Sequence, residues 1–330
     1  MRNTNFEMKA VRLHEIGGPQ KLVLDDVPEP QALRGECLVR LRAAAMNHRD
    51  VFITQGLYPN ITLPKILGAD GAGEYGGRRV LIDPLIGWGG DERIWRPDAA
   101  ILGMPRDGTF AQSVVVPESN VYDIPPHLSF EEAAALPLAG VTAFRALFTR
   151  GELQHGETVL VTGIGGGVQT FVLLFAKAAG ANVFVTSGSD EKIERARALG
   201  AQGGANYRTD AAWHKTLKKA AGTIDLIVDS AGGETFARTL GLVRPGGRVI
   251  TYGGTVGDAS IKMFPVFWNQ IDIRGTSMGS PKDFRDMLAF TGEHRITPVI
   301  DTTFALAQAA QAAKRMSAAG QFGKIVLSIP

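Results

Sequence analysis

The hydrophobic pattern is most regular over residues 158–180. Residues 159–161 form a continuous apolar run, which is typical of a strand covered on both faces. Glycines at 163 and 165–167 follow at once, and apolar side chains then recur at the helical spacing, at Val168, Phe171, Val172, Phe175 and Ala179. Gly180 stands where a left-handed helix C-cap is expected. The pattern predicts a strand, a glycine turn and a helix in direct succession.

The same alternation continues towards the C-terminus. Apolar strands are predicted at 158–162, 182–186, 224–229 and 248–252, with helical stretches between them. This order indicates a doubly wound parallel sheet. Residues 271–277 are expected to form its edge strand. Beyond them, the elements expected to return to the first domain are a strand at 299–303, a helix at 306–318 and a strand at 324–328.

The N-terminal part shows shorter elements. Strands are predicted at 9–13, 22–27, 36–44, 79–82 and 110–116, separated by glycine and proline turns. Residues 1 to about 125 therefore read as a β-rich domain. A short helix is expected at 47–54 and a glycine-dense turn at 67–73. Asp70 is interpreted as a turn residue in preference to the relic of a ligand motif. Residues 83–108 have no clear periodicity and are expected to form a long irregular lobe.

A helix start is predicted at Ser129, because Ser129 and Glu132 have the spacing of a capping box. Since the pattern of short strands ends just before this point, the domain junction is expected near it.

The glycine turn has two interpretations. A tight strand-to-helix turn needs glycine for purely structural reasons, whereas a β-α-β unit of about 30 residues with this turn also fits dinucleotide binding. Backbone N–H groups and the positive end of the helix dipole would face the diphosphate. Gln169 occupies the third glycine position of a G-x-x-G-x-x-G pattern. That replacement indicates a displaced helix or a side chain directed towards the cofactor.

Composition excludes several classes of protein. The chain has 330 residues, 45% hydrophobic and 21% charged, and 35 basic residues against 33 acidic ones, so no excess charge attracts nucleic acid or a membrane surface. No apolar run is long enough for a membrane span, and the polar N-terminus lacks a signal-peptide core, so we expect a cytoplasmic protein. Cys37 is the single cysteine and is expected to be a buried apolar thiol.

An ordered set of motifs resembles the medium-chain dehydrogenase/reductase superfamily. The motifs are Gly71-Ala72-Gly73-Glu74, Ala139-Gly140-Val141-Thr142-Ala143, residues 159–168, Leu199-Gly200-Ala201, Pro245-Gly246-Gly247-Arg248 and Gly323-Lys324-Ile325-Val326. The resemblance covers nearly the whole chain. It implies an α/β fold with a GroES-like β-rich substrate domain, residues 1–128 and 278–330. A Rossmann domain with a doubly wound parallel sheet, residues 129–277, would lie between these segments in the sequence.

The resemblance is to the zinc-free, quinone oxidoreductase-like branch, whose members include proteins named as zinc-type alcohol dehydrogenase-like. The three positions that hold catalytic zinc ligands in the zinc branch are Asn47, Ala69 and Leu138 here, and the 83–108 lobe has no cysteine for a structural zinc. No metal ligand is therefore predicted.

The resemblance implies that NADPH is the cofactor. NAD-selecting Rossmann domains carry an acid at the end of the second strand, and this position is Ser187, while Asp190 is interpreted as a helix-start acid. Lys192 and Tyr207 are expected beside the 2′-phosphate; the alternative for Lys192 is an incidental solvated lysine. The predicted cofactor-binding residues are Thr142, Gly163, Gly165, Gly166, Gly167, Val168, Ser187, Ser189, Lys192, Tyr207, Ser230, Gly253, Gly254, Met278 and Lys324.

The leading hypothesis from the resemblance is an NADPH-dependent reductase of quinones or α,β-unsaturated carbonyls. Asn47 and Tyr58 are the predicted catalytic residues, although Tyr58 before Pro59 also reads as a turn aromatic. His48 is either a contact to the cofactor diphosphate or a surface histidine.

Two alternatives remain open. An enoyl-thioester reductase would need a basic rim, for which Arg93, Arg96 and Arg106 are candidates or else ordinary solvated charges. A catalytically silent NADPH-binding redox sensor or crystallin-like protein is the other. In each case a homodimer formed through the edge strand, residues 271–275, is expected.

Overall fold

The computed structural model describes residues 6–330, and its chain divides into two compact units. Unit 1 comprises the chain up to residue 139 together with 280–330, and unit 2 comprises residues 140–279. The polar N-terminal stretch used for the cytoplasmic prediction lies largely outside the described residues. Within residues 6–330, no helix is both long and apolar enough to cross a membrane.

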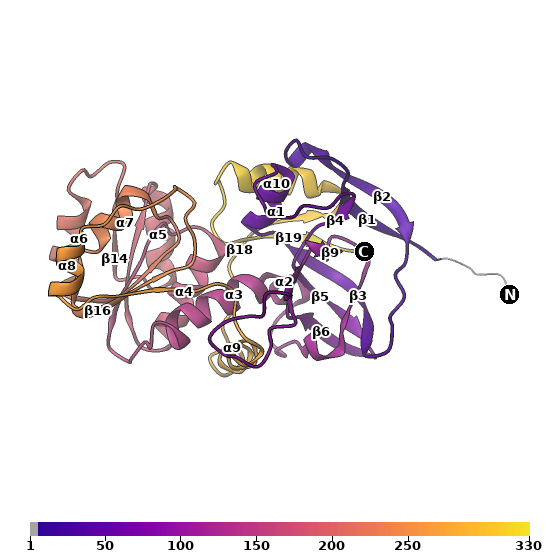
Figure 1. The fold of residues 1–330 in the computed structure, drawn as a ribbon, viewed down its shortest axis with the longest axis horizontal. Coiled ribbons are helices and arrows are strands. Elements are labelled where there is room, and N and C mark those ends of the chain that lie inside the picture. Colours follow the sequence, from indigo (N-terminus) through magenta and orange to yellow (C-terminus); the bar gives the residue numbers. More distant parts are fainter. Residues whose placement is uncertain (1–5) are drawn as a thin grey trace. The chain divides into compact units, whose positions relative to one another are not determined.

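Unit 1 is built mainly of strands (Figure 1). Its strands are β1 (Glu7–Leu13), β2 (Leu22–Pro28), β3 (Glu36–Ala45), β4 (Lys65–Ile66), β5 (Asp70–Tyr75), β6 (Arg78–Ile82), β7 (Leu85–Ile86), β8 (Ala100–Leu102), β9 (Pro105–Arg106), β10 (Ser113–Pro117), β11 (Val121–Asp123), β18 (Ile300–Ala305) and β19 (Lys324–Ser328). Its helices are α1 (His48–Thr54), α2 (Phe130–Ala135), α9 (Pro281–Glu293) and α10 (Ala309–Ser317), with 3-10 turns at Pro19–Lys21, Glu118–Asn120 and Leu306–Gln308.

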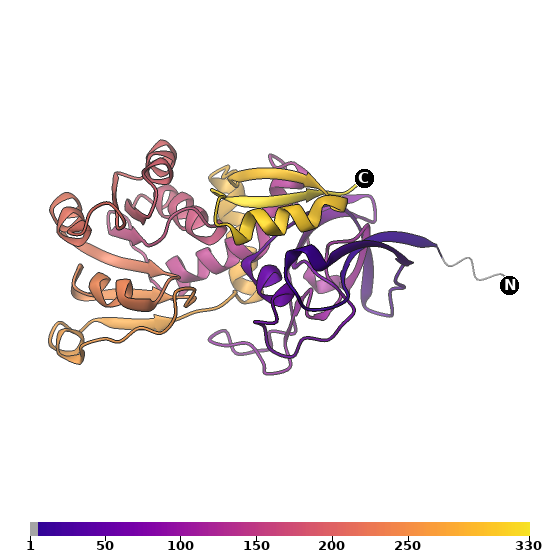
Figure 2. The ribbon, with the colours of Figure 1, turned by 90° about the horizontal axis from the view of Figure 1, so that it is seen from above.

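The central sheet of unit 1 joins the two ends of the chain. Its strand order is β11-β6-β5-β3-β19-β18, and β10 also pairs with β3. In Figure 2 the C-terminal strands and α10 lie beside N-terminal segments of the same unit, and antiparallel pairing of β19 with β3 sets Val326 opposite Ala45. This pairing confirms that the C-terminal strand returns to the first domain.

The 67–73 segment differs from its prediction. Residues from Asp70 onward form strand β5 rather than a turn, paired antiparallel with β3. Glycine is needed there for packing: a Cβ added to Gly73 would lie 2.0 Å from the Arg40 carbonyl oxygen. The prediction of Asp70 as a turn residue is therefore wrong, because Asp70 lies in the paired strand β5; the turn geometry is confined to Gly68, whose φ is 94°.

Two further segments of unit 1 differ from their predictions: the 83–108 lobe contains regular strands, and the helix that begins at Ser129 belongs to unit 1. The 83–108 lobe contains the small sheet β7-β8-β9, and Trp88 is buried in it. The predicted capping box at Ser129 is present, with the Ser129 hydroxyl accepting from Glu132 N at 3.1 Å. Helix α2 belongs to unit 1, because its buried alanines pack on β3 and β5. The chain leaves unit 1 at Ala139, beyond the expected junction.

Unit 2 has a parallel sheet flanked by helices (Figure 1). Its strands are β12 (Thr158–Val161), β13 (Asn182–Ser187), β14 (Gly203–Asn206), β15 (Ile224–Asp229), β16 (Val243–Thr251) and β17 (Asp272–Gly275). Its helices are α4 (Gly167–Ala178), α5 (Asp190–Leu199), α6 (Trp213–Ala221), α7 (Gly233–Thr239) and α8 (Met263–Trp268), with a π-helical turn at Arg145–Thr149; α3 (Pro137–Phe144) contains the boundary between the units.

The strand order β14-β13-β12-β15-β16-β17, with every pair parallel, confirms the doubly wound topology. The order reverses at β12. In such sheets ligands bind outside the carboxyl ends of the strands at the point of reversal. The topology therefore selects the β12–α4 turn and the ends of β13, β15 and β16 as the place to look for a site.

Candidate functional site

The β12–α4 turn contains the predicted glycine cluster. Gly163 and Gly165 have φ of 66° and 135°, which side chains rarely adopt, and Gly166 is the N-cap of α4. Gly163 N donates to Thr186 Oγ1 at 3.0 Å, which ties the turn to the end of β13. The first N–H groups of this 12-residue helix form an anion-binding end. This geometry fits the diphosphate of a dinucleotide.

A cavity of about 140 Å³ opens beside this turn within unit 2. Its lining is mostly apolar and comprises Thr162, Gly163, Thr186, Tyr207, Trp213, Ala231, Thr235, Thr239 and Val256. The position at the carboxyl ends of β12 and β13 and the aromatic lining fit the adenine end of a dinucleotide. Trp213, Thr235 and Val256 were missed by the sequence analysis, since they come from helices and a loop whose approach to β12 depends on the tertiary fold.

Two basic side chains lie over glycines at this end of the sheet. A Cβ added to Gly165 would lie 3.1 Å from Lys192 Nζ, and one added to Gly188 would lie 2.7 Å from Arg208 Nε. Ser187 ends β13, and its hydroxyl accepts from the N–H of Ser189, the N-cap of α5. Asp190 begins α5 and accepts from Asn206 Nδ2 at 2.9 Å. Arg208 was missed as a candidate; the signal was its position directly after Tyr207.

Gln169 is the side chain that replaces the third glycine of the motif. Its Nε2 donates to Ser230 Oγ at 2.6 Å, and its Oε1 would lie 2.3 Å from a Cβ added to Gly166. The amide therefore lies against the N-cap of α4 and ties the β12–α4 turn to the loop after β15. A Cβ added to Gly253 would lie 3.1 Å from the Ser230 carbonyl oxygen, so the predicted Ser230 and Gly253 are neighbours.

The other predicted residues of this half are less informative. Gly254 lies near Gly232: a Cβ added to Gly232 would lie 3.4 Å from Gly254 Cα. Thr142 is buried in α3, and Met278 is buried with a left-handed φ of 55°.

Unit 1 contains a buried polar cluster formed by Asn47, Asp70 and Lys324. Lys324 Nζ donates to Asn47 Oδ1 at 2.7 Å, Asp70 Oδ2 at 2.8 Å and the Met46 carbonyl oxygen at 2.8 Å. Asn47 Nδ2 donates to Asp70 Oδ2 at 2.9 Å. Because all three ammonium hydrogens have protein acceptors, the Lys324 side chain has no donor left for a cofactor, contrary to its predicted cofactor contact.

Asn47 precedes α1 as its N-cap, but its side chain does not cap the helix. Asp50 Oδ2 accepts from Asn47 N at 2.8 Å, as the third residue of a helix does in a capping box. Burial raises the pKa of Asp50 to about 6, and the nearby Arg49 opposes this shift. The Asn47 amide is thus directed away from the helix and into the Lys324–Asp70 pair.

Tyr58 is held by Arg49, a residue that the sequence analysis did not select. Tyr58 Oη accepts from Arg49 Nη2 at 3.3 Å, and the guanidinium lies 4.9 Å from the centre of the ring. Arg49 also donates to the carbonyl oxygens of Leu102, at 2.6 Å, and Met104, at 3.3 Å. The 83–108 lobe therefore anchors Arg49, which positions a tyrosine whose own O–H remains a donor.

His48 is exposed and begins α1. The atoms crowding its ring lower its pKa, and the Lys324 ammonium adds to this effect. A neutral imidazole near pH 7 is a weaker partner for an anion than a charged one. The exposure of His48 fits the surface-histidine interpretation.

The three positions of the zinc branch can be inspected directly. Ala69 and Leu138 carry no donor side chain, and Asn47 is committed to Lys324 and Asp70. In the part of the chain described, no three side chains of His, Cys, Asp or Glu are grouped to hold a metal ion. The residues present do not fit the three protein donors of a catalytic zinc.

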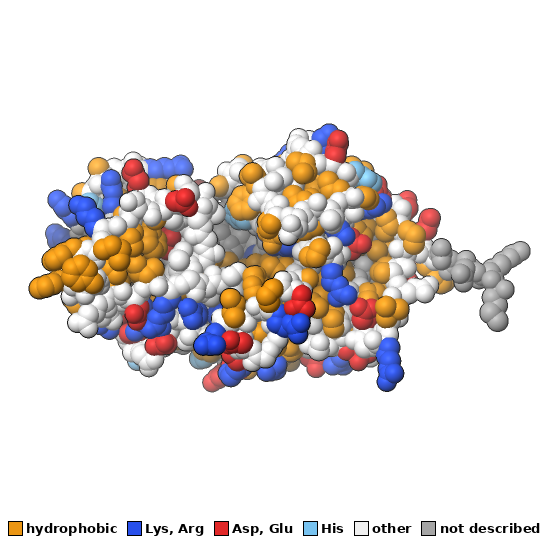
Figure 3. All heavy atoms as spheres, in the orientation of Figure 1, with side chains coloured by type: hydrophobic (Ala, Val, Ile, Leu, Met, Phe, Trp, Pro, Cys, Tyr) orange, Lys and Arg blue, Asp and Glu red, His pale blue; other side chains and the backbone are white. Residues whose placement is uncertain are grey.

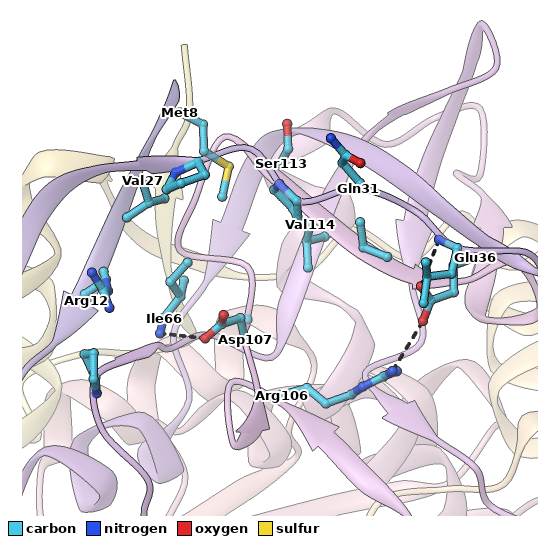
Figure 4. Close-up of a pocket in the computed structure, with 16 residues that line it drawn as sticks. Met8, Arg12, Val27, Gln31, Glu36, Ile66, Arg106, Asp107, Ser113 and Val114 are labelled. Carbon is cyan, nitrogen blue, oxygen red and sulfur yellow. Dashed lines mark hydrogen bonds and ion pairs between the residues drawn. The ribbon is translucent and has the colours of Figure 1, made fainter. Parts of the chain in front are cut away.

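A larger groove of about 480 Å³ lies elsewhere in unit 1 (Figure 4). Its charged groups are engaged by other groups of the same unit: Arg106 Nη2 donates to Glu36 Oε1 at 3.3 Å, and Asp107 Oδ1 accepts from Ile66 N at 3.1 Å. None of the predicted catalytic or cofactor-binding residues lines it, and Arg106, a candidate for the basic rim, is the one rim candidate that does. The groove is therefore separate from the two clusters above.

Comparisons with known proteins agree with this architecture. The sequence matches the family described as the alcohol dehydrogenase GroES-like domain over residues 33–126 and the one described as zinc-binding dehydrogenase over residues 167–293. The chain belongs to the medium-chain dehydrogenase/reductase superfamily and to its quinone oxidoreductase-like branch. It is an oxidoreductase of that superfamily.

Individual relatives cover nearly the whole chain. A zinc-type alcohol dehydrogenase-like protein, YogA, of Leptosphaeria maculans is 38% identical, over 93% of this chain and 94% of its own. The quinone oxidoreductase of Rattus norvegicus is 30% identical, over 97% of both chains. A crystal structure titled NAD-dependent alcohol dehydrogenase has a TM-score of 0.92 and 35% identity, covering 98% of this chain and all of that one.

Proposed function

We propose that this protein is an NADPH-dependent reductase of quinones or α,β-unsaturated carbonyls that works without catalytic zinc. The observation that carries the proposal is the nature of the polar groups in unit 1. Asn47 and Tyr58 supply hydrogen-bond donors, whereas the three positions for zinc ligands, Asn47, Ala69 and Leu138, supply neither a thiolate nor an imidazole. Oxidation of a simple alcohol needs a group that stabilises the alkoxide, which zinc provides in related enzymes. Reduction of a conjugated carbonyl needs donors for an oxygen that gains negative charge.

The role proposed for unit 2 is to hold the dinucleotide. The β12–α4 turn would hold the diphosphate, and the cavity lined by Tyr207 and Trp213 would hold the adenine. Lys192 and Arg208 would bind the 2′-phosphate. The chemistry supplied by the nicotinamide, when bound, is hydride transfer. Ser187 supports NADPH over NADH, because no carboxylate stands at the end of β13 to repel a 2′-phosphate.

The residues of unit 1 would then act on the substrate carbonyl. Asn47 Nδ2 and Tyr58 Oη would donate to its oxygen as negative charge develops there, and the proton that completes the reduction comes from solvent. Both residues would assist the reaction, and neither would form a bond to the substrate.

The enoyl-thioester alternative loses its main support. It needs free basic side chains for the coenzyme phosphates, yet Arg93 pairs with Asp91, Arg96 with Asp98, and Arg106 with Glu36. These pairs favour ordinary surface charge. A catalytically silent NADPH-binding protein, such as a redox sensor or crystallin-like protein, remains the outcome if the protein binds NADPH but turns over no substrate.

We also propose that the protein is a homodimer formed through β17. This strand ends the sheet order of unit 2, and the neighbouring helix α8 exposes Phe264, Phe267 and Trp268 by more than 60% each (Figure 3). Antiparallel pairing of two β17 strands about Ile273 would set Asp272 of one copy opposite Arg274 of the other. Within one copy Arg274 already pairs with Asp272 and Glu152, so the support for a second copy as the partner comes from the open strand edge and the exposed apolar side chains of α8.

The test of the proposed reaction joins metal analysis with an assay. Purified protein is expected to contain no stoichiometric zinc and to consume NADPH with 1,4-benzoquinone or 2-cyclohexen-1-one, but not to oxidise ethanol with NADP⁺. Stoichiometric zinc with chelator-sensitive oxidation of ethanol would overturn the proposal.

A further inference from the structure

The Lys324–Asp70 ion pair is almost completely buried, and a contribution to the stability of the fold does not by itself explain this burial. Asp70 is fully buried and Lys324 is 2% exposed. Transferring two charges out of water is costly, and apolar side chains of similar volume often stabilise a core as well or better. The pair is nevertheless in contact with Asn47, the residue proposed to act on the substrate.

The ammonium group and both carboxylate oxygens of the pair have protein partners. The Lys324 ammonium uses its three hydrogens on Met46 O, Asn47 Oδ1 and Asp70 Oδ2. Asp70 Oδ1 accepts from Leu138 N at 2.8 Å, and Asp70 Oδ2 accepts from Asn47 Nδ2 as well as from Lys324. The Lys324 ammonium therefore has no hydrogen left for a substrate, and the Asp70 carboxylate is occupied by Asn47, Lys324 and Leu138.

This arrangement determines which way the Asn47 amide points. Its carbonyl oxygen faces an ammonium group and its nitrogen faces a carboxylate. A flipped amide would set N–H groups against the ammonium and the oxygen against the carboxylate, so both contacts would become repulsive. In the observed orientation one Nδ2 hydrogen bonds to Asp70 and the second remains.

We propose that Lys324 and Asp70 are positioning residues that lock the Asn47 amide so that it offers an N–H, and never its carbonyl oxygen, to the substrate. The inference rests on the proposed reductase function. The pair also lies at the three positions that hold zinc ligands in the zinc branch. It contacts the side chain of Asn47 and the backbone of Leu138, and Asp70 is the residue after Ala69. A fixed ion pair thus orients a neutral donor where relatives hold a metal.

The kinetic test is a double-mutant cycle. The double variant Asp70→Asn/Lys324→Met removes both charges and leaves neither unpaired, and Asn47→Ala removes the oriented amide. Each is expected to lower kcat for 2-cyclohexen-1-one about tenfold or more, with the dissociation constant of NADPH unchanged, because oriented oxyanion donors act on the chemical step. Combining the charge-free pair with Asn47→Ala is expected to lower kcat no further than either change does. The single variant Lys324→Arg, which keeps a positive charge, is expected to lose less activity than the charge-free variant. Wild-type kcat in the double variant, or losses that multiply, would overturn the inference.

A second readout does not depend on turnover. In protein labelled with ¹⁵N-asparagine, the side-chain resonances that vanish in Asn47→Ala belong to this amide. They are expected to exchange slowly in the wild type and to move to the values of a free amide in the charge-free double variant. Unchanged resonances would refute the positioning role. If the wild-type protein reduces none of the substrates while these resonances shift as expected, the proposed reaction fails and the positioning of Asn47 stands.

Discussion

Gln169 Nε2 donates to Ser230 Oγ at 2.6 Å, and this bond holds the Gln169 carbonyl oxygen against Gly166, the N-cap of α4. The oxygen therefore lies at the positive end of the helix, where the dinucleotide diphosphate is proposed to bind. Gln169 is the third residue of α4, the position from which a glutamine reaches back to the N-cap in a capping box.

Replacing Gln169 by glycine is expected to tighten binding of NADPH and NADH alike, by roughly 3- to 10-fold, because a competing oxygen leaves the diphosphate position. Gln169→Glu is expected to weaken both, since it places a negative charge there. Fluorescence titration measures both constants. The glycine variant should also lose roughly 1 kcal/mol of stability within the helix. Weaker binding by the glycine variant would contradict the competition.

Cofactor preference is expected to depend on Lys192 and Arg208. The wild-type protein should bind NADPH at least about tenfold more tightly than NADH, since charged hydrogen bonds contribute about 1.5 to 3 kcal/mol each. Lys192→Ala and Arg208→Ala should each reduce this ratio, whereas Lys218→Ala, an exposed lysine of α6, should leave it unchanged. Equal dissociation constants for the two cofactors in the wild type would refute the preference.

Tyr58→Phe is expected to slow reduction of an enone modestly. The variant loses the O–H but keeps the ring on which Arg49 lies, so the loss should stay below the roughly 100-fold seen for an indispensable oxyanion donor. Steady-state kcat measures the effect. Tyr75→Phe is the matched control, because Tyr75 Oη donates to Glu118 in the same unit, away from Arg49. An unaltered kcat in Tyr58→Phe would remove Tyr58 from the proposed site.

The dimer proposal is tested at helix α8 and strand β17. Phe267→Asp or Ile273→Arg is expected to convert a dimer into a monomer, because each places a charge in the proposed apolar contact. Ile94→Asp, at an exposed position of the 83–108 lobe, should leave the protein a dimer. Light scattering at micromolar concentration decides the matter, and a monomeric wild-type protein would count against the proposal.

Stability is expected to depend on pH through Asp83. Burial raises the pKa of Asp83 to about 7 from its ordinary value of 3.8, and the hydrogen bond from Leu85 N opposes the shift. The folded protein therefore holds a proton that the unfolded chain has released, so stability falls between about pH 4 and pH 7. The loss is at most about 4 kcal/mol, at about 1.4 kcal/mol for each pKa unit.

Asp83→Asn keeps an oxygen for Leu85 N and removes the charge. The melting temperature of the variant minus that of the wild type is expected to be larger at pH 8 than at pH 5. Asp123→Asn, an exposed position on the neighbouring strand, should show no such trend. An identical pH dependence in Asp83→Asn and the wild type would show that another group is responsible.

The sequence by itself determined the order of the elements. The apolar run at 159–161, the glycines after it and the helical spacing beyond depend on contacts between near neighbours in the chain, and β12 and α4 form where the pattern indicated. The family motifs, the predicted Rossmann topology and the loss of donor side chains at Ala69 and Leu138 could likewise be read without coordinates, because they depend on residue identity alone.

Only the tertiary structure decided the polar contacts. Asp70 looked like a turn residue because its neighbours are glycines, yet pairing of β5 with β3 buries it beside Lys324, more than 250 residues away in sequence. Arg49 and Trp213 carried no distinctive local pattern, and the contact of Gln169 with Ser230 could not be predicted from the lost glycine. Hydrogen bonds between distant side chains depend on how strands and helices pack, and a local pattern of hydrophobic and polar residues contains no record of that packing.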